Sequence, residues 1–380
     1  MSRYSLAFAN DWLMDFGGAE RCLEAMAEEF PGSPLYTLFC DLSQFRGSAV
    51  ERLNRSTTFL DRPFFKNHYR RYLALYPLAV EQLHTGSPDV LLSFSHSVAH
   101  GNLRRSVTLH GCYCFTPVRY AWDLYQDYLE MAGLVKGVKS WIAKGLLHYI
   151  RLWDAGAAPR VDSWIADSRH VAKRIRRIYG REPAVIYPPV NIERFTPSSQ
   201  RDDYFLYASR LVPYKRPDLA VRACTRLKLP LHVVGDGPEY KKLKSLAGPE
   251  TSFLGRISDE ELAREMAGAR ALLFPGEEDF GITPIEAQAA GTPVIAYGVG
   301  GALETVVPPE GDDFSQATGL FFREPTIEAL EGTLSRFAKV GGRFIPGASR
   351  RNAERFRKER YVSEMKQFIE RELEAFHGRY

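Results

Sequence analysis

The chain has 380 residues, 45% of them hydrophobic, which is enough for two domains with cores of ordinary size. Its net charge of +4 is too small to indicate nucleic-acid binding by itself. The five cysteines include no C-x-x-C pair and no histidine-linked metal spacing, which argues against zinc or a disulfide framework and favours a reducing compartment.

Apolar strands alternate with amphipathic helices almost throughout, which predicts an α/β fold with parallel sheets covered by helices on both faces. Strands are expected in the first half at 3–9, 89–95, 106–114, 162–167 and 184–187. In the second half they are expected at 203–208, 230–235, 252–255, 270–274 and 293–297. The proline-rich polar segment 187–200 has the composition of a linker between two Rossmann-like halves. A last helix is expected over roughly 350–377, after the glycine pair at 341–342.

Two stretches, 62–73 and 135–153, are basic and aromatic. The second has apolar residues at helical spacing, with lysines among them: Val138, Trp141, Ile142, Leu146 and Tyr149, and Lys136, Lys139 and Lys144. Such a helix can lie on an anionic membrane surface. The alternative is an ordinary surface helix that packs its apolar residues inward. No apolar run reaches the ~18 residues of a spanning helix, and the N-terminus does not resemble a signal peptide.

The segment 276–286 has two carboxylates eight positions apart. The buried strand 271–274 ends at Pro275, so Glu278 lies on a strand-to-helix loop and Glu286 lies inside the following helix. Backbone N–H groups at a helix N-terminus can bind phosphate oxygens, and carboxylates accept hydrogen bonds from hydroxyls. The segment therefore suits a polyhydroxylated, phosphorylated ligand, with a solvated acidic loop as the alternative.

This segment resembles the E-x7-E signature of retaining nucleotide-sugar glycosyltransferases of family four, which have the GT-B fold. Five further segments match motifs of that family: 16–21 (FGGAER), 209–217 (SRLVPYKRP), 233–239 (VVGDGPE), 253–258 (FLGRIS) and 298–305 (GVGGALET). Each match is weak alone, but the six occur in the family's order. The resemblance implies two facing Rossmann-like, doubly wound domains with an interdomain cleft. Residues 1–190 would bind the acceptor, with a C-terminal helix 355–380 crossing back to them, and residues 201–350 would bind the nucleotide sugar.

The resemblance also implies a role for each charged motif residue. The transition state of sugar transfer places negative charge on the departing phosphate, and Arg210 and Lys215 would stabilise it as a diphosphate clamp. Glu286 would accept hydrogen bonds from the ribose hydroxyls, and Glu278 would hold hydroxyls of the donor sugar. Arg210, Lys215 and Glu278 are thus the expected catalytic residues. Because the clamp supplies the charge, neither a metal ion nor a cofactor is expected.

Backbone groups complete the expected donor site. Gly17 and Gly18 lack side chains, so their backbone can approach the diphosphate closely. The remaining donor-binding residues are expected to border the sugar or the base: Phe280, Gly281, Ile282 and Thr283 at the sugar, and Gly255, Arg256 and Ile257 at the base.

A subfamily is indicated by 113–123 (YCFTPVRYAWD), which resembles the YCHTPxRYxWD segment of bacterial mannosyltransferases for O-antigen and exopolysaccharide. Those enzymes usually take GDP-mannose. Phe115 departs from the pattern, because the family has histidine there, although the backbone carbonyl at this position can still hold a sugar hydroxyl. Phe115, Arg119, Tyr120 and Asp123 are the candidates for acceptor contacts.

The expected function is a retaining, metal-independent transfer of a sugar, with mannose from GDP-mannose favoured, to a lipid-linked or oligosaccharide acceptor. The expected location is the cytoplasmic side of the cell membrane, on its anionic surface, with no nucleic-acid partner. A UDP-sugar donor is the nearest alternative. A sugar-nucleotide epimerase would lack the Arg-x4-Lys clamp, and a nicotinamide-dependent oxidoreductase would need a G-x-G-x-x-G turn. An inactive GT-B scaffold is favoured only by Phe115.

Overall fold

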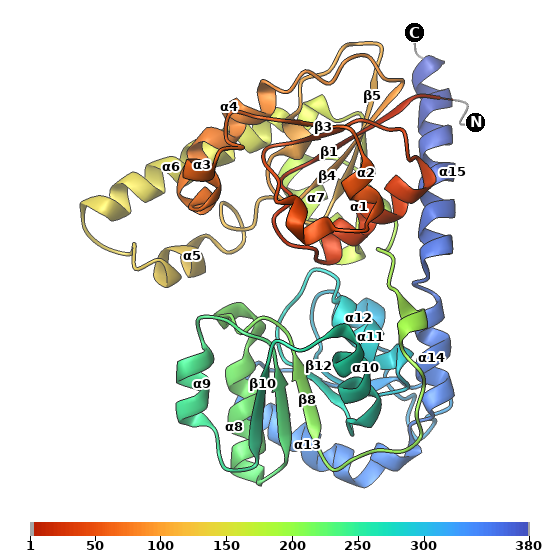
Figure 1. Ribbon diagram of the computed structural model, residues 1–380. Helices are drawn as coiled ribbons and strands as arrows, with labels where there is room; N and C mark the ends of the chain where they lie inside the picture. The colour runs from red at the N-terminus through yellow and green to blue at the C-terminus, as the bar shows by residue number, and fades with distance from the viewer. Residues whose placement is uncertain (1–3, 379–380) are drawn as a thin grey trace. The chain divides into compact units, whose positions relative to one another are not determined.

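The computed structural model describes residues 4–378 and divides the chain into two compact units (Figure 1). Unit 1 comprises Met1–Pro189 and Glu359–Tyr380, and unit 2 comprises Val190–Lys358. Each unit contains one parallel sheet with helices on both faces, so the α/β class expected from the sequence is confirmed.

Unit 1 has a seven-stranded sheet in the order β3-β2-β1-β4-β5-β6-β7. Its strands are β1 (Leu6–Asn10), β2 (Leu35–Thr37), β3 (Arg55–Thr57), β4 (Val90–Ser95), β5 (Leu109–Cys114), β6 (Ser163–Ala166) and β7 (Ala184–Val185). The direction in which strands are added reverses between β1 and β4, which makes this the switch point of the sheet. The sequence analysis did not predict β2 and β3, which have three residues each.

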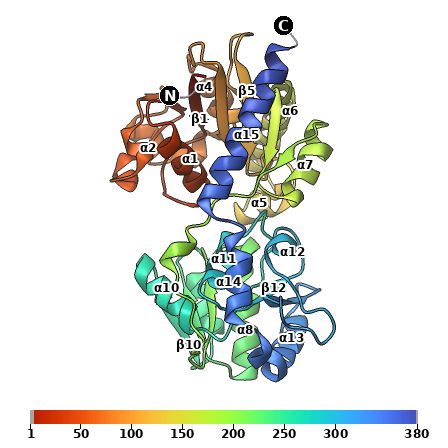
Figure 2. The same cartoon turned by 90° about the vertical axis from the view of Figure 1, so that its right-hand side faces the viewer.

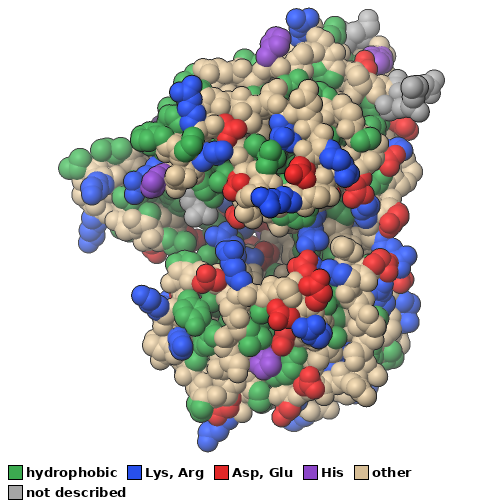
Figure 3. Space-filling view, in the orientation of Figure 1, with side chains coloured by type: hydrophobic (Ala, Val, Ile, Leu, Met, Phe, Trp, Pro, Cys, Tyr) green, Lys and Arg blue, Asp and Glu red, His purple; other side chains and the backbone are tan. Residues whose placement is uncertain are grey.

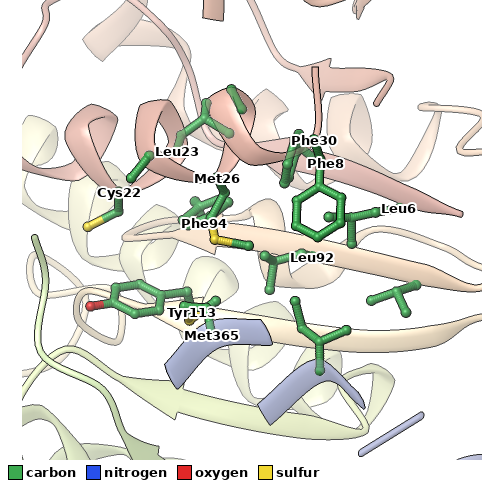
Figure 4. Close-up of a cluster of buried hydrophobic side chains, with 14 of the residues drawn as sticks. Leu6, Phe8, Cys22, Leu23, Met26, Phe30, Leu92, Phe94, Tyr113 and Met365 are labelled. Carbon is green, nitrogen blue, oxygen red and sulfur yellow. The ribbon is translucent and has the colours of Figure 1, made fainter. Parts of the chain in front are cut away.

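Side chains of β5 alternate between two cores of unit 1. Tyr113 packs into a cluster with α1 (Gly18–Glu29), α2 (Ala49–Arg52) and α15 (Lys358–His377), and Figure 4 shows it with Phe94 and Met365. Figure 2 shows α15 running along unit 1 beside α1. Cys112 and Cys114 face the other side, against α7 (Arg169–Tyr179). Burial raises the pKa of both thiols, so both stay neutral and pack as small apolar side chains.

The second face of the unit 1 sheet is covered by α4 (Tyr76–Glu81), α7 and the C-terminal part of α6 (Val138–Ala157). Two shorter helices, α3 (Pro63–Lys66) and α5 (Tyr125–Met131), lie in the segments that precede α4 and α6. In Figure 1, α5 and the N-terminal part of α6 extend away from the sheet.

Unit 2 has a six-stranded sheet in the order β10-β9-β8-β11-β12-β13. Its strands are β8 (Phe205–Ala208), β9 (Leu231–Val234), β10 (Thr251–Gly255), β11 (Leu272–Phe274), β12 (Val294–Tyr297) and β13 (Gly319–Phe322). Helices α8 (Pro217–Leu227), α9 (Tyr240–Leu246) and α13 (Ile327–Val340) pack on one core of this sheet. The remaining helices are α10 (Asp259–Gly268), α11 (Ile282–Ala289), α12 (Ala302–Thr305) and α14 (Pro346–Glu354).

The expectation of a single helix over 350–377 is wrong, because the chain forms two helices there. Helix α14 ends at Glu354 and α15 begins at Lys358. Between them Phe356 is fully buried and stacks edge-on against Phe280 of unit 2, with ring centroids 5.6 Å apart. Burying that ring requires the chain to leave the helical path before α15 begins.

Candidate active site

The switch point of unit 2 lies between β8 and β11, and the charged motif residues follow these two strands. Ligands of doubly wound sheets bind outside the carboxyl ends of the strands at such a point. Arg210 and Lys215 lie on the loop after β8, whereas Glu278 and Glu286 lie on the loop and helix after β11. The fold therefore brings together residues about 70 positions apart in the sequence.

The loop that holds Arg210 is shaped by the glycines of the 233–239 motif. A Cβ at Gly235 would lie 2.0 Å from the carbonyl oxygen of Ser209, and one at Gly237 would lie 2.4 Å from that of Leu211. The N–H of Leu211 donates to the carbonyl of Asp236 at 3.0 Å. Two backbones can pack this closely only without side chains between them. The motif thus fixes the backbone of Arg210, whose exposed guanidinium has no ion pair with any described residue.

Lys215 and Glu278 form an ion pair, with 2.6 Å between Nζ and Oε1. The ammonium group also donates to Ser209 Oγ at 2.8 Å. Both charged side chains are about one-fifth exposed, at 18% and 19%. A Cβ at Gly276 would lie 2.7 Å from the Cα of Lys215, so the β11 loop also touches the β8 loop through its backbone. Two of the three expected catalytic residues are therefore in direct contact.

The loop around Glu278 is supported from behind by the glycines of the 298–305 motif. The N–H of Gly301 donates to the carbonyl of Glu278 at 2.9 Å. A Cβ at Gly301 would lie 2.1 Å from the carbonyl oxygen of Phe280. Gly281 has a φ of +89° and immediately precedes α11, so the turn into the helix needs glycine. The backbone N–H groups of Ile282 and Thr283 then open the first turn of α11.

Glu286 is buried in α11 and pairs with Arg194, with 2.8 Å between Oε1 and Nη2. Arg194 also contacts Asp259 at 2.5 Å and lies 4.6 Å over the ring of Phe195. The sequence analysis did not predict this partner of Glu286. Arg194 lies in the segment expected to be a linker, 92 positions before Glu286. Only the fold brings the short helical turn Ile192–Arg194 against α11.

The residues expected at the base lie at the end of β10, two strands from β8. Gly255 has a φ of +69°, and its carbonyl accepts from the N–H of Gly235 at 2.7 Å. Arg256 is exposed and Ile257 is partly buried. Their contact with a base remains a prediction.

In unit 1, Gly17 and Gly18 begin α1. The N–H of Gly17 donates to Glu20 Oε2 at 3.0 Å, so one of the two expected glycine donors is already used within the motif. Burial raises the pKa of the Glu20 carboxyl, and the nearby imidazole of His96 opposes this shift. The glutamate of the GGAER motif thus holds the helix start in place.

The segment around Phe115 is tied to the rest of unit 1 by polar contacts. Phe115 is partly buried and lies edge-on against Tyr113, with centroids 5.2 Å apart. The hydroxyl of Tyr120 hydrogen-bonds Ser97 Oγ at 3.0 Å. Asp123 pairs with Arg174 at 2.6 Å, so its carboxylate is held within the unit. An acceptor role for these residues and for Arg119 stays a prediction.

Two general properties of the described residues bear on the site. Within residues 4–378, no group of three or more His, Cys, Asp or Glu side chains is placed to hold a metal ion. No helix in this part of the chain is long and apolar enough to span a membrane.

Two family models match the chain in succession. "Glycosyltransferase Family 4" matches residues 16–194, and "Glycosyl transferases group 1" matches residues 191–352. The fold is of the GT-B type, and both parts of the chain match glycosyltransferase models. The model matched by residues 16–194 is that of family four, the family that the six motifs indicated.

Curated relatives match part of the chain. A GDP-mannose-dependent monoacylated alpha-(1-6)-phosphatidylinositol monomannoside mannosyltransferase of Corynebacterium glutamicum is 30% identical, over 45% of this chain and 53% of that protein. A D-inositol 3-phosphate glycosyltransferase of Nocardioides is 33% identical, over 38% of this chain and 40% of that protein. The chain therefore spans about half or less of the length of these relatives.

Solved structures resemble the whole fold. Anabaena HepE in complex with UDP has a TM-score of 0.69 and 16% identity, with 96% of this chain and 99% of that chain covered. Sucrose-phosphate synthase from Thermosynechococcus elongatus has a TM-score of 0.69 and 19% identity, with coverage of 98% and 100%. At these identities the likeness concerns the fold alone.

Proposed function

We propose that the chain transfers a sugar from a nucleoside diphosphate to a hydroxyl group with retention of anomeric configuration and without a metal ion. The observation that supports this most directly is the Lys215–Glu278 pair beside Arg210 at the switch point of unit 2. A diphosphate placed there meets two cations, while the carboxylate can turn to the hydroxyls of the attached sugar.

The proposed chemistry needs few protein groups. As the bond between the sugar and the phosphate breaks, negative charge grows on the leaving oxygen, and the preorganised cations stabilise it. The acceptor oxygen bonds to the anomeric carbon, and its proton passes to the leaving phosphate. Lys215 would exchange its contact with Glu278 for the phosphate when the donor binds.

The favoured donor is GDP-mannose, because residues 113–123 resemble the mannosyltransferase segment and because a matching relative is a GDP-mannose-dependent enzyme. The UDP complex of HepE keeps UDP-sugars as the second candidate. A panel of GDP- and UDP-sugars, tested by calorimetry and by donor hydrolysis without acceptor, decides between them. Tight binding and slow hydrolysis of GDP-mannose alone are expected. If no donor is bound or cleaved, the proposed activity is wrong.

We further propose that α6 places the protein on an anionic membrane, where a lipid-linked acceptor would be found. The apolar residues that the sequence placed on this helix mostly face outward: Val138 is 77% exposed, Trp141 80% and Ile142 61%. The buried positions are instead occupied by Leu147 and Ile150. Inward packing, the alternative reading of this helix, therefore does not account for its N-terminal half. Figure 3 shows hydrophobic and basic side chains together on the part of unit 1 that α5 and α6 form.

Vesicle binding tests this surface. At low salt the protein should bind phosphatidylserine-containing vesicles, with about 1 kcal/mol for each lysine near the surface. Reversing Lys136, Lys139 and Lys144 to glutamate should abolish binding and leave transfer to a soluble acceptor intact. The matched control reverses three exposed lysines of unit 2, Lys241, Lys244 and Lys339, at the same change in net charge. Equal loss of binding in both triple variants would leave only net charge as the cause and contradict the proposal.

A further inference from the structure

Arg194 joins three separate segments of unit 2. It ends the short helical turn Ile192–Arg194, and its guanidinium contacts Glu286 of α11 at 2.8 Å and Asp259, the first residue of α10, at 2.5 Å. The guanidinium also lies 4.6 Å from the centre of the Phe195 ring. The side chains of Arg194 and Glu286 are only 15% and 11% exposed, so their contact is shielded from water, whereas Asp259 is 68% exposed. The arginine is therefore held in one place against the carboxylate of Glu286.

The carboxylate of Glu286 needs a cation beside it for two reasons. A charge that is taken out of water without a partner destabilises the fold. An unpaired carboxylate also repels any anion that binds nearby, and the clamp of Arg210 and Lys215 in the same unit is expected to bind a diphosphate. Arg194 supplies the opposite charge. Because a carboxylate has about four acceptor sites, a contact with one arginine does not exhaust its capacity to accept hydrogen bonds.

The contacts of Arg194 lie between segments that are expected to bind different parts of a nucleotide. Asp259 directly follows the 253–258 motif, whose residues are expected at the base. Glu286 belongs to the helix after the β11 loop, and that loop touches the loop of the clamp, which is expected at the diphosphate. In a nucleoside diphosphate the ribose joins the base to the diphosphate. An arginine that bridges α10 and α11 is therefore placed to act on a group that binds the ribose.

We propose that Arg194 is a positioning residue, which sets the carboxylate of Glu286 to bind the 2′- and 3′-hydroxyls of a nucleotide ribose. The inference rests on the proposed transfer from a nucleoside diphosphate and adds a residue that none of the six motifs contains. Both hydroxyls donate to the carboxylate, and no bond is made or broken. Their spacing on the ring is fixed, so a carboxylate that turns away loses both hydrogen bonds. Unit 2 thereby prefers ribonucleotides to nucleotides that lack these hydroxyls.

The affinities of the full chain for GDP and for 2′,3′-dideoxy-GDP, both measured by calorimetry, test the proposal. The wild type should bind GDP roughly 10- to 100-fold more tightly, because the dideoxy nucleotide lacks two hydrogen bonds to a carboxylate. Arg194→Met should reduce this preference to less than about threefold, mainly by weakening GDP. A wild-type preference for GDP in Arg194→Met would overturn the proposal.

Arg350 provides the matched control, because it joins the same helical turn to α11 through backbone carbonyls. It donates to the carbonyls of Ile192 and Phe195 at 2.7 and 3.0 Å and to that of Ala289 at 3.4 Å. Arg350→Met should lower the unfolding temperature and weaken the two nucleotides equally, if at all, so the preference for GDP remains. The same equal weakening in Arg194→Met would show a structural role for Arg194 and overturn the proposal.

A second pair of variants gives a test that leaves no unpaired carboxylate at position 286, in case Arg194→Met alone does not fold. Glu286→Ala should show the same low preference for GDP as Arg194→Met. Adding Arg194→Met to Glu286→Ala should weaken GDP no further, because the arginine acts through the carboxylate. A further loss of GDP affinity in the double variant would overturn the proposal, as would a wild-type preference in Glu286→Ala.

The wild type itself separates this proposal from the proposed function. A wild type that binds GDP and dideoxy-GDP equally would overturn the role of Arg194 and leave the proposed sugar transfer standing. If the wild type binds UDP instead of GDP, the same comparison applies to UDP and 2′,3′-dideoxy-UDP. A wild type that binds neither GDP nor UDP would refute the proposed transfer itself.

Discussion

The two units share one topology but differ in what they present at the switch point. Unit 2 presents cations there, with Arg210 exposed and Lys215 held by Glu278. Unit 1 presents the imidazole of His96, held by the buried carboxylate of Asp11 beside an aromatic ring. Cations suit a diphosphate, whereas an imidazole next to an aromatic side chain suits the hydroxyls and faces of neutral sugars. Similar sheets thus present different chemical groups at their switch points.

The largest effect is expected from removing the cations of unit 2. Arg210→Ala or Lys215→Ala should each lower the transfer rate by roughly 10²–10³-fold, the scale for one preorganised charge-stabilising group. Melting should be unchanged, because Arg210 is exposed and the Lys215 ammonium makes polar contacts with the side chains of Ser209 and Glu278 at the surface of the site. Steady-state kinetics and thermal unfolding measure both. Arg222→Ala, at an exposed arginine on α8, is the control. Near-normal turnover in either variant would show that the cation removed does not stabilise the leaving phosphate, and would contradict the comparison between the units.

Replacing each of the two glutamates of the E-x7-E segment should have a different effect. Glu286→Ala should weaken the free nucleoside diphosphate as much as the intact donor, roughly 10- to 100-fold, if it binds the ribose. Arg194→Met should act in the same direction, because it leaves the carboxylate of Glu286 without its cation. Glu278→Ala should spare nucleoside diphosphate affinity and damage transfer. Calorimetry with the nucleotide and with the donor separates the cases, and the reverse pattern would mean that the donor lies the other way round.

A smaller effect is expected from Phe115→His. The substitution keeps a ring of similar volume and adds two ring nitrogens. The rate should change by less than about tenfold, because the leaving phosphate accepts the acceptor's proton and the backbone carbonyl at this position can hold a sugar hydroxyl whatever the side chain. Transfer assays at fixed donor concentration measure this. A native chain that transfers nothing, together with an active Phe115→His variant, would show that the replaced histidine was essential.

As the pH is lowered, unit 1 should lose stability at a higher pH than unit 2. Burial, with the Arg104 charge as a lesser cause, lowers the pKa of His110 to about 3 from an ordinary value of 6.5. The unfolded chain therefore binds a proton that the fold excludes. The contribution of this group is complete above pH 6.5 and falls towards pH 3, by up to ~1.4 kcal/mol per pH unit for one proton. Unit 2 contains one of the nine histidines, His232, which pairs with Glu265.

Hydrogen exchange at pH 7 and pH 5 checks this expectation. Peptides of β4 and β5 should lose protection at pH 5 before those of β8 and β11. In His110→Gln, which cannot titrate, the pH dependence of unit 1 should be shallower, even if protection starts lower. Loss of protection at pH 5 in β8 and β11 before β4 and β5 would contradict this expectation.

Periodicity predicted most of the architecture. Each of the ten expected strands overlaps an observed strand, because apolar runs between polar loops make a clear pattern. Strands β2 and β3 were missed because of their length, and β13 because its Gly-Leu-Phe-Phe follows a loop rich in polar residues. The break at Phe356 depends on a tertiary contact with Phe280, which local sequence cannot show.

The candidate site was predictable where motifs are local. The charged residues of unit 2 all belong to short motifs: Arg210, Lys215, Glu278 and Glu286. The strands that precede these motifs were also predicted. Arg194 belongs to none of these motifs, and neither does Asp11, whose buried carboxylate accepts hydrogen bonds from the backbone N–H groups of residues 96–99. These contacts appear only once distant segments meet. A single aspartate after a strand is common, and nothing in the sequence relates Asp11 to a loop 85 residues later.

The order of the elements along the chain has a consequence for how the molecule is made. Unit 1 is built from segments that precede and follow unit 2, and unit 2 is one uninterrupted segment between them. Six residues of α15 belong to the unit 1 core that also contains residues of β1, β4 and α1: Tyr361, Met365, Phe368, Ile369, Leu373 and Phe376. During synthesis, unit 2 has all its residues before unit 1 does. The unit that leaves the ribosome first is therefore the last that can complete its core, and until then the face of its sheet that α15 covers stays open to water or to a chaperone.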